Sequence, residues 1–332
     1  MKQSFEVIYF EFTAPLHISN ARADDYGVSE KTIHSDTIHA AIMQSWAILG
    51  KTEWIKAIPD FTISSLFPFT PKLKTNEMVH FFAKPFLKPN AGKSEVRTED
   101  AKKFKKIKYV DIPHFESYIS NKEVASTTDS IQDSYQTFDA IDKDFMTSDV
   151  QPRIKRPRDE QQDSKPFYTE RIFFKKGSGM FCLVQYENES IRKQVKAALN
   201  LLAENGIGTD RAVGNGQFKV SFGKIDIEIA ENTNYAMNMS LFCPESKSNL
   251  AEILEDKNVK YEIIKRGGWL SEPHNKLRKR SIYMFKEGSV FRINAAKPFS
   301  KGKTVDLLPA LPSKIENPIY RVGKALFLPV KL

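Results

Sequence analysis

The sequence predicts an α+β protein with two tandem ferredoxin-like (RRM-like) domains and a large insertion in the first. Two observations support this prediction. The 332 residues suit two domains of about 150 residues each. The expected elements run strand, helix, strand, then hairpin strand, helix and strand, which is the βαββαβ order of a ferredoxin-like unit. We place the first domain at 1–229, with an insertion at about 75–165, and the second at 230–332.

The first strand and helix are predicted by residue type and spacing. Residues 3–12 (QSFEVIYFEF) are rich in β-branched and aromatic residues, which favour a strand. An apolar stripe with helical spacing follows, formed by Ile38, Ala41, Ile42, Ser45 and Leu49. Ser35 or Asp36 is the expected N-cap of this helix, and Gly50 is expected to end it.

The insertion has a different character. Residues 78–87 favour a strand, whereas the remainder is first lysine-rich and then acidic. Because few apolar residues there suit a core, we expect a partly mobile segment that a ligand or a neighbouring chain orders.

Regular structure is predicted again from Tyr168. The apolar runs 169–176 and 180–188 are joined by Gly177-Ser178-Gly179, which favours a hairpin. A helical stripe over 191–202 then ends at Asn205-Gly206. Residues 217–229 alternate between apolar and polar side chains and predict the last strand of the first domain.

The second domain is expected to repeat this scheme loosely. Its predicted strands are 235–243, 259–264 and 320–330. A helix with Ser248 or Asn249 as N-cap follows the first of them, and Glu252 completes a capping box. Residues 281–293 predict a hairpin that turns near Glu287-Gly288.

Composition excludes several classes of protein. Hydrophobic residues make up 41% and charged residues 27% of the chain, a balance typical of folded proteins. No apolar run approaches the ~18 residues of a membrane-spanning helix, so we expect no membrane partner. Cys182 and Cys243 lack CxxC spacing, which argues against a disulfide framework or a cysteine-based metal site and favours a cytoplasmic location.

Charge is distributed unevenly along the chain, whose formal net charge is +9. Residues 72–108 hold eleven Lys or Arg and four acids, and residues 259–303 hold twelve and three. Residues 111–149 reverse the balance, with nine acids and two bases. Such segregation indicates either contact with a polyanion or ordinary solvated faces.

A glycine-rich segment, GIGTDRAVGNGQF at 206–218, follows the predicted second helix. It fits neither a Rossmann fingerprint nor a Walker A loop, because the order is helix, loop, strand and no Gly-Lys-Ser/Thr is present. Free backbone N–H groups in such a loop form an anion-binding nest, to which Arg211 adds a phosphate contact. The alternative is a helix C-cap followed by a bulged entry into the next strand.

This glycine-rich loop resembles that of the RAMP superfamily of CRISPR-associated proteins. HSDTIHAAIM at 34–43 is similar to the opening helix of that family. RGGW at 266–269, EGSVF at 287–291 and NPIYRVGKALFLPV at 317–330 resemble the subunit that caps the crRNA 5′ end in type III-A (Csm) effector complexes, the fourth member of the Csm set. The related capping subunit of type III-B complexes is the nearest alternative.

The resemblance implies two RAMP domains, no nuclease activity and no cofactor or metal. It implies binding of the crRNA 5′ handle and a role in antiviral defence. It further implies docking to the large polymerase-like CRISPR subunit on one side and to the repeated RAMP backbone subunit on the other. The insertion would then be the thumb, which separates handle from guide by kinking the RNA.

Three groups of residues are candidates for contact with RNA, because single-stranded RNA offers phosphates, sugars and unstacked bases. The first lies before and at the start of the first helix: His17, Ser19, Asn20, His34, Ser35 and Asp36. The second is the glycine-rich loop: Gly206, Gly208, Asp210, Arg211, Gly214, Asn215 and Gly216. The third combines cations with a stacking ring: Arg266, Trp269, Lys276, Arg278, Lys279 and Arg280. N-capping is the alternative for Ser35 and Asp36, and core packing for Trp269.

Two other functions remain open at this point. In a metal-independent crRNA-processing endoribonuclease, His17 and His34 would act as acid and base. In a purely protein-binding adaptor, the basic faces would meet an acidic partner. A metal triad in HSDTIH is disfavoured, because His34, Asp36 and His39 diverge around a helix.

Overall fold

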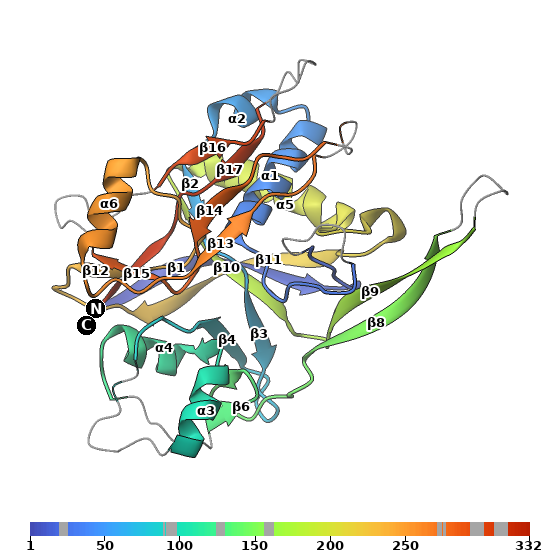
Figure 1. The fold of residues 1–332 in the computed structure, drawn as a ribbon. Coiled ribbons are helices and arrows are strands. Elements are labelled where there is room, and N and C mark those ends of the chain that lie inside the picture. The colour runs from blue at the N-terminus through green and yellow to red at the C-terminus, as the bar shows by residue number, and fades with distance from the viewer. Residues whose placement is uncertain are drawn as a thin grey trace.

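The computed structural model describes residues 1–19, 26–88, 90, 98–123, 130–155, 163–270, 274, 277–292, 302–308 and 318–332. Sheets with few helices make up these residues, which confirms the α+β class (Figure 1). The first ferredoxin-like unit comprises β1 (Lys2–Phe12), α1 (Ser35–Ile48), β2 (Phe61–Ile63), β3 (Phe67–Pro71), β10 (Gly179–Tyr186), α5 (Glu189–Asn205) and β11 (Phe218–Glu228). A short helix, α2 (Thr52–Ala57), follows α1.

The strands of this unit lie in the order β11-β1-β10-β3, all antiparallel, and β2 also pairs with β10. The first and third strands are therefore central, as in a ferredoxin-like sheet. Residues alternate between the two faces of β1. Ile8 and Phe10 pack with Trp46 of α1 and Val195 of α5, while Val7 packs in the cluster on the opposite face.

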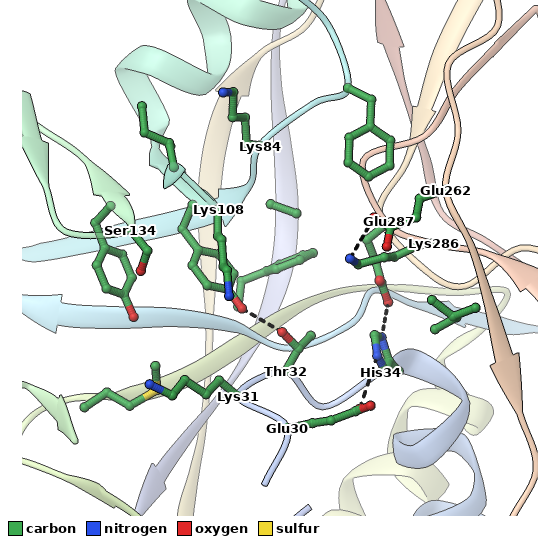
Figure 2. Close-up of a pocket in the computed structure, with 18 of the residues that line it drawn as sticks. Glu30, Lys31, Thr32, His34, Lys84, Lys108, Ser134, Glu262, Lys286 and Glu287 are labelled. Carbon is green, nitrogen blue, oxygen red and sulfur yellow. Dashed lines mark hydrogen bonds and ion pairs between the residues drawn. The ribbon is translucent and has the colours of Figure 1, made fainter. Parts of the chain in front are cut away.

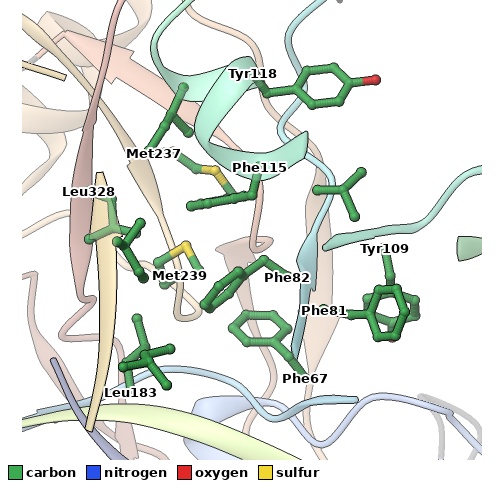
Figure 3. Close-up of a cluster of buried hydrophobic side chains, with 14 of the residues drawn as sticks. Phe67, Phe81, Phe82, Tyr109, Phe115, Tyr118, Leu183, Met237, Met239 and Leu328 are labelled. Carbon is green, nitrogen blue, oxygen red and sulfur yellow. The ribbon is translucent and has the colours of Figure 1, made fainter. Parts of the chain in front are cut away.

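The insertion extends the same sheet and contributes to its core. Its strands β4 (Met78–Ala83), β5 (Tyr109–Asp111), β7 (Tyr135–Gln136) and β6 (Ile131–Gln132) follow β3 in that order, and its helices are α3 (Thr98–Lys106) and α4 (Ile112–Ile119). Figure 3 shows Phe82 and Phe115 packed with Met237 and Leu328 from the C-terminal part of the chain. Phe81 belongs to the same cluster, and its ring centre lies 4.9 Å from that of Tyr135. The expectation of few core residues is wrong, because isolated aromatic residues in short elements converge on one cluster.

The end of the insertion and the residues that follow it form an arm. β8 (Met146–Lys155) and β9 (Lys165–Phe174) pair with each other and project from the body (Figure 1). The predicted hairpin across Gly177-Ser178-Gly179 is therefore wrong, since β10 pairs with β1, β2 and β3 instead of β9. A Cβ atom at Gly179 would collide with the Phe10 carbonyl oxygen. The absence of a side chain at Gly179 therefore allows β10 to pack closely against β1.

The described residues of the C-terminal part form three small sheets. β12 (Tyr235–Asn238) lies between β15 (Val290–Arg292) and β18 (Phe327–Val330). β13 (Ile263–Arg266) pairs with β14 (Ile282–Phe285), and β16 (Thr304–Asp306) pairs with β17 (Tyr320–Val322). α6 (Lys247–Glu255) follows β12.

Several predictions for this part need correction. The expected hairpin at 281–293 does not form, because β14 pairs with β13 and β15 with β12. The N-cap of α6 is Ser246, whose hydroxyl accepts a hydrogen bond from the Asn249 N–H at 3.0 Å. The strand predicted at 320–330 is divided into β17 and β18.

Candidate nucleic-acid interface

A buried ion-pair network joins the first turn of α1 to the C-terminal part. The Asp36 side chain is fully buried and accepts hydrogen bonds from Arg266 Nε at 2.9 Å and Arg266 Nη2 at 3.0 Å. Arg321 of β17 donates to the same carboxylate. Burial alone would raise the pKa of Asp36, but the two guanidinium groups hold it well below its usual range. Asp36 is therefore an ionised anchor between the two parts.

His34 forms a second buried link. Its Nδ1 lies 2.8 Å from Glu287 Oε1, and its Nε2 lies 3.4 Å from Glu30 Oε2 (Figure 2). Burial opposes protonation of the imidazole, but the Glu287 and Glu30 carboxylates outweigh it and raise the pKa of His34 to about 9. Ser65 donates a further hydrogen bond to Glu287. His34 is thus a cation at neutral pH.

These contacts correct the roles expected at the start of α1. The N-cap is His34, and its side chain makes no capping bond. Ser35 is buried, and its hydroxyl accepts a hydrogen bond from the Leu241 N–H at 3.0 Å. Ser35 and Asp36 therefore join two parts of the chain instead of facing RNA. Their partners lie more than two hundred residues away, so local pattern gave no sign of them.

Most N–H groups of the glycine-rich loop are already hydrogen-bonded to main-chain carbonyl oxygens. α5 ends at Gly206, as predicted, and the short 3₁₀ helix η2 (Arg211–Val213) follows. Seven residues of the loop donate their N–H groups to main-chain carbonyl oxygens: Gly206, Ile207, Thr209, Val213, Gly214, Asn215 and Gly216. The expected nest of free N–H groups is wrong for these residues.

The glycines of this loop permit close packing of main chain on main chain. A Cβ atom at Gly216 would collide with the Ile207 carbonyl oxygen, and one at Gly208 with the His17 carbonyl oxygen. Gly206 would place its Cβ 2.5 Å from the Asn215 carbonyl oxygen, and Asn215 itself is buried. The helix C-cap and bulged strand entry is the better interpretation.

Side chains around the loop already have partners. Asp210 Oδ2 lies 2.6 Å from Arg153 Nη1 of β8, so this ion pair joins the loop to the arm. Arg211 Nη1 donates to Gln44 Oε1 of α1 at 3.2 Å. The fully buried His17 ring bonds the Glu170 carbonyl oxygen through Nδ1 at 2.7 Å. Ser19 is half-buried, and its main chain forms an isolated β-bridge with Ser29, whereas Asn20 lies outside the described residues.

The third predicted group is partly brought together. The Arg278 guanidinium lies 4.6 Å from the centre of the half-buried Trp269 ring, a cation–π contact. Arg280 Nη2 donates to the Asp306 carbonyl oxygen at 2.9 Å. Burial, together with Arg321, lowers the pKa of Lys279 to about 8. Lys276 lies outside the described residues, and Arg266 belongs to the buried network.

A cleft of about 1050 Å³ opens beside this network, between the first domain, the insertion and the C-terminal part (Figure 2). We call it the interdomain cleft. Its lining comprises residues 28–32, His34, Phe67, 83–87, Lys105, 107–109, 133–135, Lys143, Met146, Glu170, Glu262, 264–266, Lys286 and Glu287. This lining therefore holds eight Lys or Arg side chains against five carboxylates.

The charges of the interdomain cleft are unevenly neutralised. Glu262 pairs with Lys286 at 2.9 Å, and Glu30 and Glu287 pair with His34. By contrast, five lysines make no ion pair with any described residue: Lys31, Lys105, Lys108, Lys143 and Lys265. Thr32 and Tyr109 offer hydroxyl groups, which lie 2.6 Å apart. Unpaired ammonium groups and hydroxyls on a concave surface suit phosphates and sugars.

Sequence reasoning missed this cleft, although one signal pointed to it. The two basic segments at 72–108 and 259–303 supply Lys84, Lys105, Lys108, Lys265 and Lys286 to its walls. The two segments are brought together by tertiary contacts, which the sequence does not reveal. The Phe86 N–H, for example, donates to the Gly288 carbonyl oxygen at 2.9 Å.

The described residues form neither a cluster of metal ligands nor an acid–base pair of His17 and His34. No group of three or more His, Cys, Asp or Glu among them is placed to hold a metal ion. His17 and His34 are both buried and bonded to different partners, which does not suit an acid–base pair facing a substrate. No helix in the described part of the chain is long and apolar enough to cross a membrane.

The protonated His34 predicts a pH-dependent stability. Its pKa rises from 6.5 to about 9 on folding, so its contribution is complete below pH 6.5 and is lost as the pH rises through 9. We expect the urea midpoint of the wild-type chain to fall across this window more steeply than that of His34→Gln. Lys279 titrates in the same window in both proteins, so their difference isolates His34. An equal pH dependence of the urea midpoint in the two proteins would contradict a stabilising role of protonated His34.

Two family models match this chain. Residues 9–219 match the RAMP superfamily, and residues 231–330 match the CRISPR Csm4 C-terminal domain. A curated protein of Thermococcus onnurineus (strain NA1), "CRISPR system Cms protein Csm4", is 25% identical over 175 residues. These residues are 53% of this chain and 52% of that protein, so the chain matches about half the length of this relative.

Solved structures share the fold over nearly the whole chain. One match, with a TM-score of 0.63 and 18% identity, is in a Csm1-Csm4 cassette in complex with cA4 and covers 99% of both chains. Another, with the same TM-score and identity, is in a Csm3-Csm4 subcomplex of the type III-A CRISPR-Cas interference complex. It covers 98% of this chain and 100% of that chain.

Proposed function

Because this chain belongs to the RAMP superfamily and ends in a Csm4-type domain, we propose that it is the crRNA-binding and scaffolding subunit of a type III-A CRISPR complex. It holds the crRNA 5′ handle and joins the large polymerase-like subunit to the repeated RAMP backbone subunit in the cytoplasm. Similar chains in a Csm1-Csm4 cassette and a Csm3-Csm4 subcomplex support these two partners.

The interdomain cleft carries the RNA-binding part of this proposal. Three parts of the chain bring unpaired lysines to one concave surface, including Lys31, Lys108 and Lys265. Single-stranded RNA is a flexible polyanion, which such a surface attracts through phosphate contacts without reading sequence. The thumb role belongs to the arm of β8 and β9, which projects from the body (Figure 1).

The same geometry supports a binding role without catalysis. The imidazoles considered for acid–base chemistry are enclosed, and the cleft lysines are suited to hold phosphate. The Csm4-type domain at 231–330 favours a type III-A complex over type III-B.

Co-expression of the full chain with the large subunit, the backbone subunit and precursor crRNA tests the proposal. We expect a tag on this chain to recover both proteins and crRNA with an intact handle. Recovery of both proteins with no RNA contact to this chain would identify an adaptor. Discrete EDTA-resistant cleavage of precursor by the purified chain, abolished by His17→Ala, would identify an endoribonuclease.

A further inference from the structure

The hairpin of β13 and β14 presents an exposed face with two tyrosines. Ile263 and Lys265 lie on one face of β13, and their cross-strand partners on β14 are Phe285 and Tyr283. Tyr261 precedes β13 and packs edge-to-face on Phe285 at 5.2 Å. We call Tyr261, Ile263, Lys265 and Tyr283 the tyrosine face.

This face is exposed in the described structure. Tyr283 is 64% exposed, Ile263 52% and Tyr261 48%. Among the described residues, the hydroxyl groups of Tyr261 and Tyr283 have no hydrogen-bond partner. Exposed aromatic and apolar side chains that lie together on one surface are a feature of binding sites.

We propose that the tyrosine face stacks unpaired bases of a single-stranded RNA segment that leaves the interdomain cleft. The proposal rests on the proposed RNA-binding function and adds a second contact area to it. Aromatic rings accept any base, because every base has a π-face. Lys265 lies directly opposite Tyr283, so its ammonium group is placed to meet the phosphate of a base stacked on that ring.

Continuity with the cleft and local charge favour RNA over a protein occupant. Lys265 belongs both to the tyrosine face and to the lining of the interdomain cleft. The neighbouring carboxylate of Glu262 is neutralised by Lys286 at 2.9 Å, so it repels phosphate little. Lys265 is part of the face, and lysine is depleted in the cores of protein interfaces.

Binding of labelled single-stranded oligoadenylate to the full chain, alone and in the assembled complex, tests this inference. Tyr283→Ala should weaken binding about tenfold, because one base no longer has a ring to stack on. Tyr283→Phe keeps the ring and should remain within about twofold of wild type. The matched control is Phe222→Ala, which removes an exposed ring on β11 that also lies near a lysine, Lys196.

Each outcome bears on the inference separately from the proposed function. Unchanged affinity in Tyr283→Ala would overturn the stacking role, while wild-type binding would leave the proposed function standing. Loss of a protein partner without loss of RNA affinity would assign the face to that protein and overturn the inference. Failure of the wild-type chain to bind RNA, both alone and in the complex, would overturn both.

Discussion

Asp36→Asn is expected to lower the free energy of unfolding by about 3–5 kcal/mol, the cost of leaving buried charges without their partner. Arg266 and Arg321 both donate to the Asp36 carboxylate, and the neutral amide cannot balance two guanidinium groups. Urea unfolding at neutral pH measures the change. Because the pair joins two parts of the chain, the variant should also expose both parts to limited proteolysis.

The matched control is Asp226→Asn, which removes an exposed carboxylate paired with Lys2 at 3.2 Å. Its urea midpoint should equal that of wild type, since exposed ion pairs add little. Equal destabilisation by the two substitutions would show that burial of Asp36 between the arginines is not what holds the parts together.

Charge reversal in the interdomain cleft should weaken RNA binding strongly. Lys31→Glu combined with Lys108→Glu removes two unpaired cations from the lining of the cleft and adds two anions there. We expect at least a tenfold reduction in affinity, and a salt slope smaller by ~0.7 for each phosphate that the chain no longer neutralises. Fluorescence anisotropy with handle RNA across a salt series measures both quantities.

Lys219→Glu combined with Lys224→Glu is the control for this change. Both lysines are exposed on β11 and outside the cleft lining, and the double substitution alters net charge equally. If the affinity falls equally in the two double variants, the attraction is a property of net charge and not of the cleft.

The elements that could be predicted from sequence are those set by local periodicity. β1, α1, α5 and β11 appear where their apolar spacing placed them, and Gly206 ends α5 as expected. Which strands pair with each other was harder to predict from the sequence. Glycines between two apolar runs are typical of hairpins, yet at Gly179 and Gly288 they allow close approach to other main chain and the runs pair elsewhere.

The same contrast between local patterns and long-range contacts applies to the candidate site. Residue types indicated phosphate binding at the glycine-rich loop, but most of its N–H groups already donate hydrogen bonds within the chain. Asp36 and Arg266 were each singled out for RNA and instead bond to each other across 230 positions. The cleft itself was indicated only by charge segregation, because its walls come from distant segments such as those of Lys31, Lys108 and Lys265.

Ultraviolet crosslinking of crRNA to the assembled complex, followed by mapping of the adducts on this chain, tests the central claim most directly. The interdomain cleft should yield adducts on peptides that contain Lys31, Lys108 or Lys265. Adducts confined to the glycine-rich loop at 206–216, with none on the cleft walls, would contradict the account.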